Sequence, residues 1–474
     1  MESGQIIGEI TEIFRALSAI PHPSGHEEAL ARAVAERLRA MGGTVETDGV
    51  WNLRCDLPAS PGLEDTPRVC VQGHLDMVCA VAPGSGYDPL RDGIRIRVEG
   101  GWLRSDGRSS LGADNLLANC AVLWLLGQNF PHGPVRLLLT TMEEQALGGA
   151  RAMDPRWLEG VQFLINTDGF RGDRIIIGSA GGCRQHWRRT MLSVPAEGPA
   201  FRLTLTGFPG GHSGDDIAKG RVNPLRLLAR LLAGTDTEVA ALSGGTALNA
   251  IPAAATAVVV PRDPERLRRA LDRVTEAGGR AVLEPLSGPA PEIWAPVDRQ
   301  AALDFLLSLP HGLLAMNPDY PKVPACSANL GVVDLDGDTL SVRVFLRGTP
   351  QEALDRAAGG CALVADRCGF ALEREVRYPP WGGTGHNPLA EAMSALWERR
   401  NGTPIEVTPV HVGLEPSRLL RGRPDLTAAV LGVTIRNAHS VRERAELASL
   451  PPFVRLLRDT LTHIARRKGD LSPC

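Results

Sequence analysis

Residues 135–144 read VRLLLTTMEE, and this stretch decides how the rest of the chain is interpreted. A short run with strand character is followed by two threonines, a methionine and the adjacent glutamates Glu143 and Glu144. Two neighbouring carboxylates at the end of a buried strand repel each other unless a cation or a shared proton relieves the repulsion. The alternative is a solvated loop or a first helical turn, where acidic residues suit the helix dipole.

Strands and helices alternate along the first part of the chain. This alternation predicts an α/β layer with a largely parallel sheet. Ser24 and Glu27 match a capping box and predict the start of a helix that ends at Gly42. The other elements that carry the prediction are strands at 68–72, 135–139 and 163–166, and a fully buried helix at 116–126.

Polar residues follow these elements at their ends. His74 and Asp76 follow the first strand, Asp168 follows the third, and Asp114 precedes the buried helix. Ligands of open α/β sheets bind beyond the carboxyl ends of the strands, so we expect these groups to converge with the glutamate pair. Imidazole and carboxylate donors without a thiolate favour zinc, with cobalt or manganese as alternatives. Asp114 alone can also be explained as a helix cap.

Length and composition indicate a globular chain with more than one core. The sequence has 474 residues, of which 43% are apolar, and its net charge is −3. Neither sign of charge forms a long run, which argues against nucleic acid or a membrane surface as a partner. We expect neither a secretory signal nor a membrane-spanning helix. The nine cysteines are scattered without a CxxC pair and predict reduced thiols in a cytoplasmic protein.

The middle of the chain has a different pattern. Strand-helix-strand successions recur there and end in the Pro- and Gly-rich run at 378–388, which predicts an inserted α+β domain. We therefore predict three segments: a first part of the catalytic domain at 1–184, the inserted domain at 185–385, and a second part of the catalytic domain at 386–474.

Several ordered motifs also resemble the signature blocks of the cytosolic aminoacyl-histidine dipeptidases of peptidase family M20. That family belongs to a larger clan of di-metal aminopeptidases, carboxypeptidases and deacylases. The similarity spans most of the chain. The motifs are PHPSGHE at 21–27, HLDMV at 74–78, LGADN at 111–115, TTMEE at 140–144, INTD at 165–168, GGHSG at 210–214, HVGLE at 411–415 and TIRNAHS at 434–440.

The resemblance implies a role for each matching residue. Asp76 would orient a metal-bound imidazole, and Glu143 would be the general base for a water that bridges two divalent ions. The inserted domain would be a lid that also mediates a possible homodimer. The five implied metal ligands are His74 and Asp168 on one ion, Glu144 and His439 on the other, and Asp114 between them.

The lid would carry the residues that act on the substrate. The resemblance implies that His212 of GGHSG stabilises the oxyanion, and that Asn249, Arg347 and His411 contact a small peptide. GGHSG can also be a glycine turn with an exposed histidine. Asn249 and Arg347 can equally be routine polar groups at turn or strand edges.

The implied activity is hydrolysis of the amide bond of dipeptides, aminoacyl-histidine substrates included. The alternatives are a deacylase of N-acyl amino acids and a catalytically silent homologue that binds metal or peptide.

The chain also departs from the family pattern. Met142 stands where the family usually has an acid, and Val441 and Arg442 replace a proline and an acid after His439. These changes bear on specificity more than on hydrolysis.

Overall fold

The computed structural model describes residues 2–382, 385–423 and 425–471. The chain forms two compact units. The first unit comprises Met1–Gly178, Gly382–Pro409 and Leu414–Cys474, and the second comprises Ser179–Trp381 and Val410–Gly413. No pattern in the sequence predicts the short return segment Val410–Gly413. Gly383 and Thr384, within the predicted exit segment, lie outside the described residues.

A mixed sheet forms the centre of the first unit. Its four central strands, in the order β6-β3-β7-β24, run parallel, whereas β1, β2 and β8 pair antiparallel. This arrangement confirms the predicted α/β class. The strands are β1 (Thr44–Thr47), β2 (Leu53–Leu57), β6 (Val135–Thr140), β3 (Arg68–His74), β7 (Val161–Gly169), β24 (Thr427–Gly432), β8 (Arg174–Ser179), β22 (Trp381–Gly382) and β23 (Glu406–Val410).

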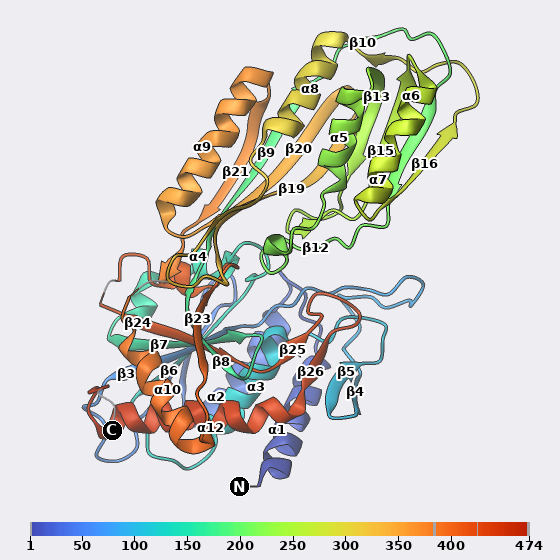
Figure 1. Cartoon of the computed structure of the whole chain (residues 1–474). Coiled ribbons are helices and arrows are strands. Elements are labelled where there is room, and N and C mark those ends of the chain that lie inside the picture. The colour runs from blue at the N-terminus through green and yellow to red at the C-terminus, as the bar shows by residue number, and fades with distance from the viewer. Residues whose placement is uncertain (1, 383–384, 424, 472–474) are drawn as a thin grey trace. The chain divides into compact units, whose positions relative to one another are not determined.

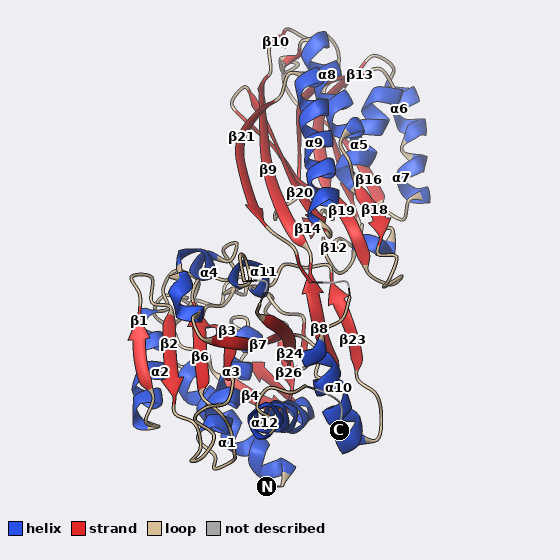
Figure 2. Cartoon of the chain, turned by 90° about the vertical axis from the view of Figure 1, so that its left-hand side faces the viewer, coloured by secondary structure: helices blue, strands red, loops and turns tan. Residues whose placement is uncertain are grey.

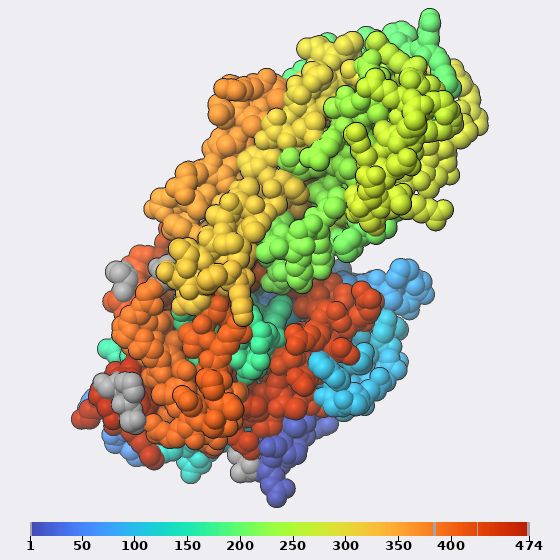
Figure 3. Space-filling model, in the orientation of Figure 1, coloured from blue at the N-terminus to red at the C-terminus, as the bar shows by residue number. Residues whose placement is uncertain are grey.

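Helices from both ends of the chain pack around this sheet. The helices are α1 (Ser3–Ser18), α2 (Glu28–Ala40), α3 (Ala113–Leu126), α10 (Pro388–Asn401) and α12 (Leu450–Arg466). Helix α3 packs on β3 and β7, and its residues are buried on every side, as predicted. Helices α1 and α12 pack on α3 and on each other, so the N-terminal and C-terminal segments lie side by side (Figure 1; Figure 3).

The predicted capping box at Ser24 is wrong. Helix α2 begins at Glu28, and neither predicted capping side chain bonds to its partner in that motif. Ser24 Oγ instead donates a hydrogen bond to Asp76, and the Glu27 carboxylate accepts from the Met142 amide. The loop before α2 therefore supports residues that are distant in the sequence.

A smaller sheet lies beside the main sheet of the first unit. It has the order β25-β26-β5-β4 and joins residues near 100 to residues near 440. This pairing ties the segment that precedes α3 to the segment that follows β24. Its strands are β4 (Ile96–Glu99), β5 (Trp102–Ser105), β25 (Ile435–Arg436) and β26 (Arg444–Glu446).

The second unit contains a sheet in the order β16-β11-β15-β13-β19-β20-β9-β21, with β18 also paired to β19. Helices α5 (Pro224–Gly234), α8 (Pro296–Ser308) and α9 (Gln351–Cys368) pack on it (Figure 2). Leucine, valine and aromatic side chains between these layers form its core. The strands are β9 (Gly181–Thr190), β11 (Phe201–Thr206), β13 (Thr237–Gly244), β15 (Ala255–Pro261), β16 (Arg280–Pro285), β18 (Gly312–Met316), β19 (Pro324–Asp336), β20 (Thr339–Gly348) and β21 (Ala371–Tyr378).

Two further features concern the whole of the described chain. No helix in the described ranges has both the length and the apolar character needed to cross a membrane. The eight cysteines that the structure describes are free thiols, and most of them are buried.

Candidate metal centre and active site

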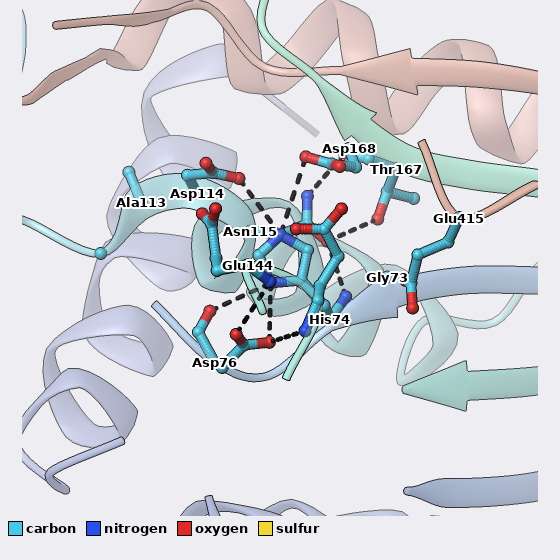
Figure 4. A network of polar contacts seen from close by, with 12 residues as sticks. Gly73, His74, Asp76, Ala113, Asp114, Asn115, Glu144, Thr167, Asp168 and Glu415 are labelled. Atoms are coloured by element: carbon cyan, nitrogen blue, oxygen red, sulfur yellow. Dashed lines mark hydrogen bonds and ion pairs between the residues drawn. The ribbon is translucent and has the colours of Figure 1, made fainter. Parts of the chain in front are cut away.

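Three of the predicted metal ligands, His74, Glu144 and Asp168, lie at or just beyond the carboxyl ends of parallel strands (Figure 4). His74 is the last residue of β3, and Asp168 is next to the last residue of β7. Glu144 follows the end of β6, and His439 lies in the turn between β25 and β26 of the smaller sheet. Because parallel strands end at the same edge of a sheet, residues far apart in the sequence meet there.

Asp114 lies at the centre of this group. Its Oδ1 is 3.3 Å from His74 Nε2, and its Oδ2 is 3.0 Å from His439 Nε2. The residue occupies the start of α3 with φ −80° and ψ 106°, which is not a helical conformation. Its carboxylate thus faces one imidazole with each oxygen.

The remaining two carboxylates each approach one of the two histidines. Asp168 Oδ1 lies 3.8 Å from His74 Nε2, and Glu144 Oε1 lies 2.6 Å from His439 Nε2. Three sets of possible ligand atoms result, and the atoms of each set lie within 4.8 Å of one another: His74-Asp114-Asp168, Asp114-Glu144-His439 and His74-Glu143-Glu144. Asp114 belongs to the first two sets, which together contain the five predicted ligands.

Asp76 holds both His74 and the glutamate pair in place through hydrogen bonds. The His74 Nδ1 nitrogen donates to the Asp76 backbone carbonyl at 3.0 Å, which directs Nε2 towards Asp114 and Asp168. The Asp76 carboxylate accepts hydrogen bonds from the backbone amides of Glu143 and Glu144. One buried acid therefore fixes both an imidazole and the glutamate pair.

The pKa values of these groups reflect crowding of buried carboxylates. Burial and the neighbouring Asp114 raise the pKa of Asp168 to about 8. Burial also raises the pKa of Glu143 well above its usual range, and Glu144 and Asp168 add to the effect. For His439, burial is outweighed by Asp114 and Glu144, which raise its pKa to about 11. Cationic imidazoles thus offset part of the repulsion between the acids.

The donor set fits divalent metal ions. Two imidazole nitrogens and three carboxylates, with no thiolate, suit zinc, cobalt or manganese. Within the described part of the chain, the buried Asp168 Oδ1 has no hydrogen-bond donor. A buried carboxylate oxygen without a donor is costly, and a cation relieves that cost.

Two buried glutamates border the centre and have no role in the sequence-based prediction. Glu415 accepts hydrogen bonds from Thr140 Oγ1 at 2.7 Å and from Gln72 Nε2. Glu443 accepts backbone hydrogen bonds at the start of α3. Burial raises the pKa of each carboxyl to about 7. Glu415 ends the HVGLE motif and Glu443 follows His439 by four residues, so their positions beside motif residues were the available signal.

Met142 adopts a left-handed conformation in the turn that carries the glutamate pair. Its φ is 50°, its amide donates to Glu27, and its carbonyl accepts from Gln145 and Gly148. These backbone bonds shape the turn. Nothing in the structure explains why a methionine side chain stands at this position.

His212 lies in the second unit, in the short strand β12 (Gly211–His212), which pairs with β14 (Ala250–Ile251). The backbone amides of Gly214 and Asp215 point at its Nδ1 atom, each at 3.3 Å. Because Nδ1 accepts these bonds, the ring proton belongs on Nε2. The Asp215 carboxylate lies 3.5 Å from the same Nδ1 atom.

The predicted substrate contacts also belong to the second unit. Arg347 is buried on β20 and donates to the Tyr378 hydroxyl at 3.3 Å. Ser327 lies opposite Arg347 on the neighbouring strand β19, and its Oγ is 2.7 Å from His411 Nε2. Burial and the charge of Arg347 lower the pKa of His411 to about 3, which keeps this imidazole neutral. The Asn249 carbonyl accepts from the Ser213 amide beside His212.

Comparisons with known proteins support the interpretation of these motifs. The family model described as peptidase family M20/M25/M40 matches residues 70–463. The chain is 31% identical over 472 residues to the cytosol non-specific dipeptidase of Escherichia coli K12, covering 96% of this chain and 97% of that protein.

Solved structures agree with this result. An aminoacylhistidine dipeptidase from Vibrio alginolyticus is 28% identical with a TM-score of 0.78, and the match covers 96% of each chain. Human carnosine dipeptidase 1 shares the fold, with a TM-score of 0.55 at 12% identity over 98% of each chain. The chain therefore belongs to peptidase family M20/M25/M40, as its motifs predict.

Proposed function

We propose that this protein is a metal-dependent dipeptidase that cleaves small peptides with a free C-terminal carboxylate. The observation that carries the proposal is the position of Asp114, whose two oxygens face His74 and His439 within two overlapping sets of ligand atoms. The names of the Escherichia coli and Vibrio alginolyticus relatives support a dipeptide as the substrate class.

Five residues would hold two divalent ions in this proposal. His74 and Asp168 would bind one ion, Glu144 and His439 the other, and Asp114 both. Zinc is the first choice, and cobalt or manganese would also suit these donors. Bound ions of this kind polarise a carbonyl and lower the pKa of water. Asp76 would keep His74 in the tautomer that leaves Nε2 free.

Glu143 would move the proton during hydrolysis. Asp76 holds the Glu143 backbone amide at 2.8 Å, which fixes the residue beside the ligand Glu144. A carboxylate oxygen of Glu143 would take a proton from the attacking water and pass it to the nitrogen of the leaving amine.

The second unit would supply the substrate contacts. His212, with its proton on Nε2, would donate a hydrogen bond to the oxygen of the scissile carbonyl as negative charge develops. The planar guanidinium of Arg347 suits the C-terminal carboxylate of a dipeptide. We propose Asn249 and His411 as further contacts. We also propose a cytoplasmic location, as in the name of the Escherichia coli relative, and a homodimer formed through the second unit.

A substrate panel tests this proposal directly. The purified protein is assayed with zinc, cobalt or manganese against dipeptides, carnosine included, and against N-acetyl amino acids. We expect hydrolysis of dipeptides and its loss in Glu143→Ala. Cleavage of acylated amino acids alone would indicate a deacylase. Metal binding without turnover of any substrate would indicate a silent homologue.

A further inference from the structure

One buried carboxylate near the metal centre has no place in the proposed mechanism. Glu443 is 3% exposed and accepts hydrogen bonds from four consecutive backbone amides. Its Oε2 accepts from Leu111 at 2.9 Å and Gly112 at 3.0 Å. Its Oε1 accepts from Ala113 at 2.9 Å and from Asp114 at 3.3 Å. Both carboxylate oxygens of Glu443 thus accept hydrogen bonds from one short segment of backbone.

The four amides need this acceptor because of where they lie. The first amides of a helix have no partner within the helix, and the start of α3 has no side-chain cap of its own. Gly112 adopts φ 68° just before the helix, which turns the amides of this segment towards one point. A carboxylate there also interacts favourably with the N-terminal end of the helix dipole. Glu443 supplies the missing cap from a distant part of the chain.

The same residue belongs to the turn that carries His439. The Glu443 amide donates to the Ser440 carbonyl at 2.9 Å, and Ser440 Oγ donates to the Asn437 carbonyl at 2.7 Å. Asn437 and His439 have φ values of 54° and 61°, so the turn has a tightly defined backbone. Glu443 therefore connects the backbone of Asp114 to the turn that carries His439.

We infer that Glu443 is a positioning residue that fixes the separation of Asp114 and His439 for metal binding. It would touch neither the ions nor the substrate. Without it, the Asp114 segment and the His439 turn would remain in the fold but would lose the connection that sets their spacing. This inference rests on the proposed function, because it takes Asp114 and His439 as ligands of one ion.

The affinity of the protein for zinc, measured without substrate, tests this inference. The metal-free wild type, Glu443→Gln and Glu443→Asp are titrated with zinc in competition with a chromophoric chelator. Glutamine removes the charge, whereas aspartate keeps the charge but is too short to reach both pairs of amides. We expect zinc affinity to fall about 10- to 100-fold in both variants, the usual effect of losing a group that supports a metal ligand.

Asp298→Asn provides a matched control for loss of stability. Asp298 is also a 3% exposed carboxylate that accepts a backbone amide, that of Leu192, but it pairs with Arg189 as well and lies in the second unit. We expect this substitution to lower the melting temperature of the metal-free protein without changing zinc affinity. Circular dichroism of each variant identifies those that fold.

The outcomes separate this inference from the proposed function. Wild-type affinity in Glu443→Asp would overturn the positioning role and leave only an effect of charge. This variant alone decides the question if Glu443→Gln does not fold. Absence of zinc binding in the wild type would instead refute the proposed metal centre, whatever the variants do.

Discussion

His439 Nε2 lies 3.0 Å from Asp114 Oδ2, although 325 residues separate them in the chain. The other Asp114 oxygen faces His74, so one carboxylate connects two imidazoles that belong to different elements of the first unit. Burial opposes ionisation of Asp114, but its hydrogen bonds with His439 and His74 lower its pKa. Asp114 and His439 therefore form an ionic contact, and a divalent metal bound between them would replace it.

Removal of bound metal should destabilise the first unit. Without the ions, the buried carboxylates around Asp114 repel one another. At a free metal concentration of about 100 times Kd, binding stabilises a protein by about 2.7 kcal/mol. We expect a chelator to lower the melting temperature and abolish hydrolysis, and zinc to restore both. Scanning calorimetry measures the shift, and Asp114→Asn should show a smaller one. An unchanged melting temperature and activity would contradict metal dependence.

Substitutions of the two adjacent glutamates should have different effects on kcat and metal content. Glu143→Gln removes the proton acceptor and should lower kcat by about 10²- to 10⁴-fold while metal content stays at the wild-type value. Glu144→Gln removes a carboxylate that faces His439 and should reduce metal content as well as activity. Metal analysis by mass spectrometry together with kcat measures both effects. Equal metal loss in the two variants would contradict this division of roles.

The central sheet and its polar edge could be predicted because they depend on local patterns. Apolar runs ending in polar residues identify β3, β6 and β7, and the shared edge of a parallel sheet brings His74, Asp168 and the glutamate pair together. The buried helix α3 could be predicted for the same reason, since its apolar residues leave no polar face.

Residues that act through backbone contacts could not be predicted. Ser24 matches a helix cap by its spacing to Glu27, but its hydroxyl bonds to Asp76, a tertiary contact that local propensity does not encode. Glu443 stands near a motif residue, His439, but its role depends on backbone amides at the start of α3, and backbone donors leave no pattern in side-chain identity. The return segment Val410–Gly413 depends likewise on long-range packing.

Arg347 should control the affinity for a free C-terminal carboxylate. Hydrogen bonds to charged groups contribute about 1.5 to 3 kcal/mol, so Arg347→Met should raise KM for a dipeptide by roughly 10- to 100-fold. The same dipeptide with an amidated C-terminus should bind the wild type weakly and the variant no worse. Arg188→Met serves as a control, because Arg188 is a partly exposed arginine of the same unit that pairs with Glu373. Equal losses for both substrates in Arg347→Met would contradict recognition of the carboxylate.

Acid should destabilise the second unit through His311. Burial, reinforced by Arg226, lowers the pKa of this histidine to about 4, and its Nδ1 accepts a hydrogen bond from the Leu330 amide at 3.4 Å. An unfolded histidine titrates near pH 6.5. Between about pH 6.5 and 4 the unfolded state therefore binds a proton that the folded state does not, and stability falls as the pH falls through this window.

His311→Gln should remove this part of the acid sensitivity, because glutamine does not titrate. The measurement is the melting temperature of metal-free protein at pH 7 and at pH 4.5, which keeps metal release out of the comparison. We expect a smaller drop between the two pH values for His311→Gln than for the wild type. His386→Gln, at an exposed position of the first unit, should retain the wild-type drop. If the His311 variant loses as much stability as the wild type, other buried groups account for the acid sensitivity.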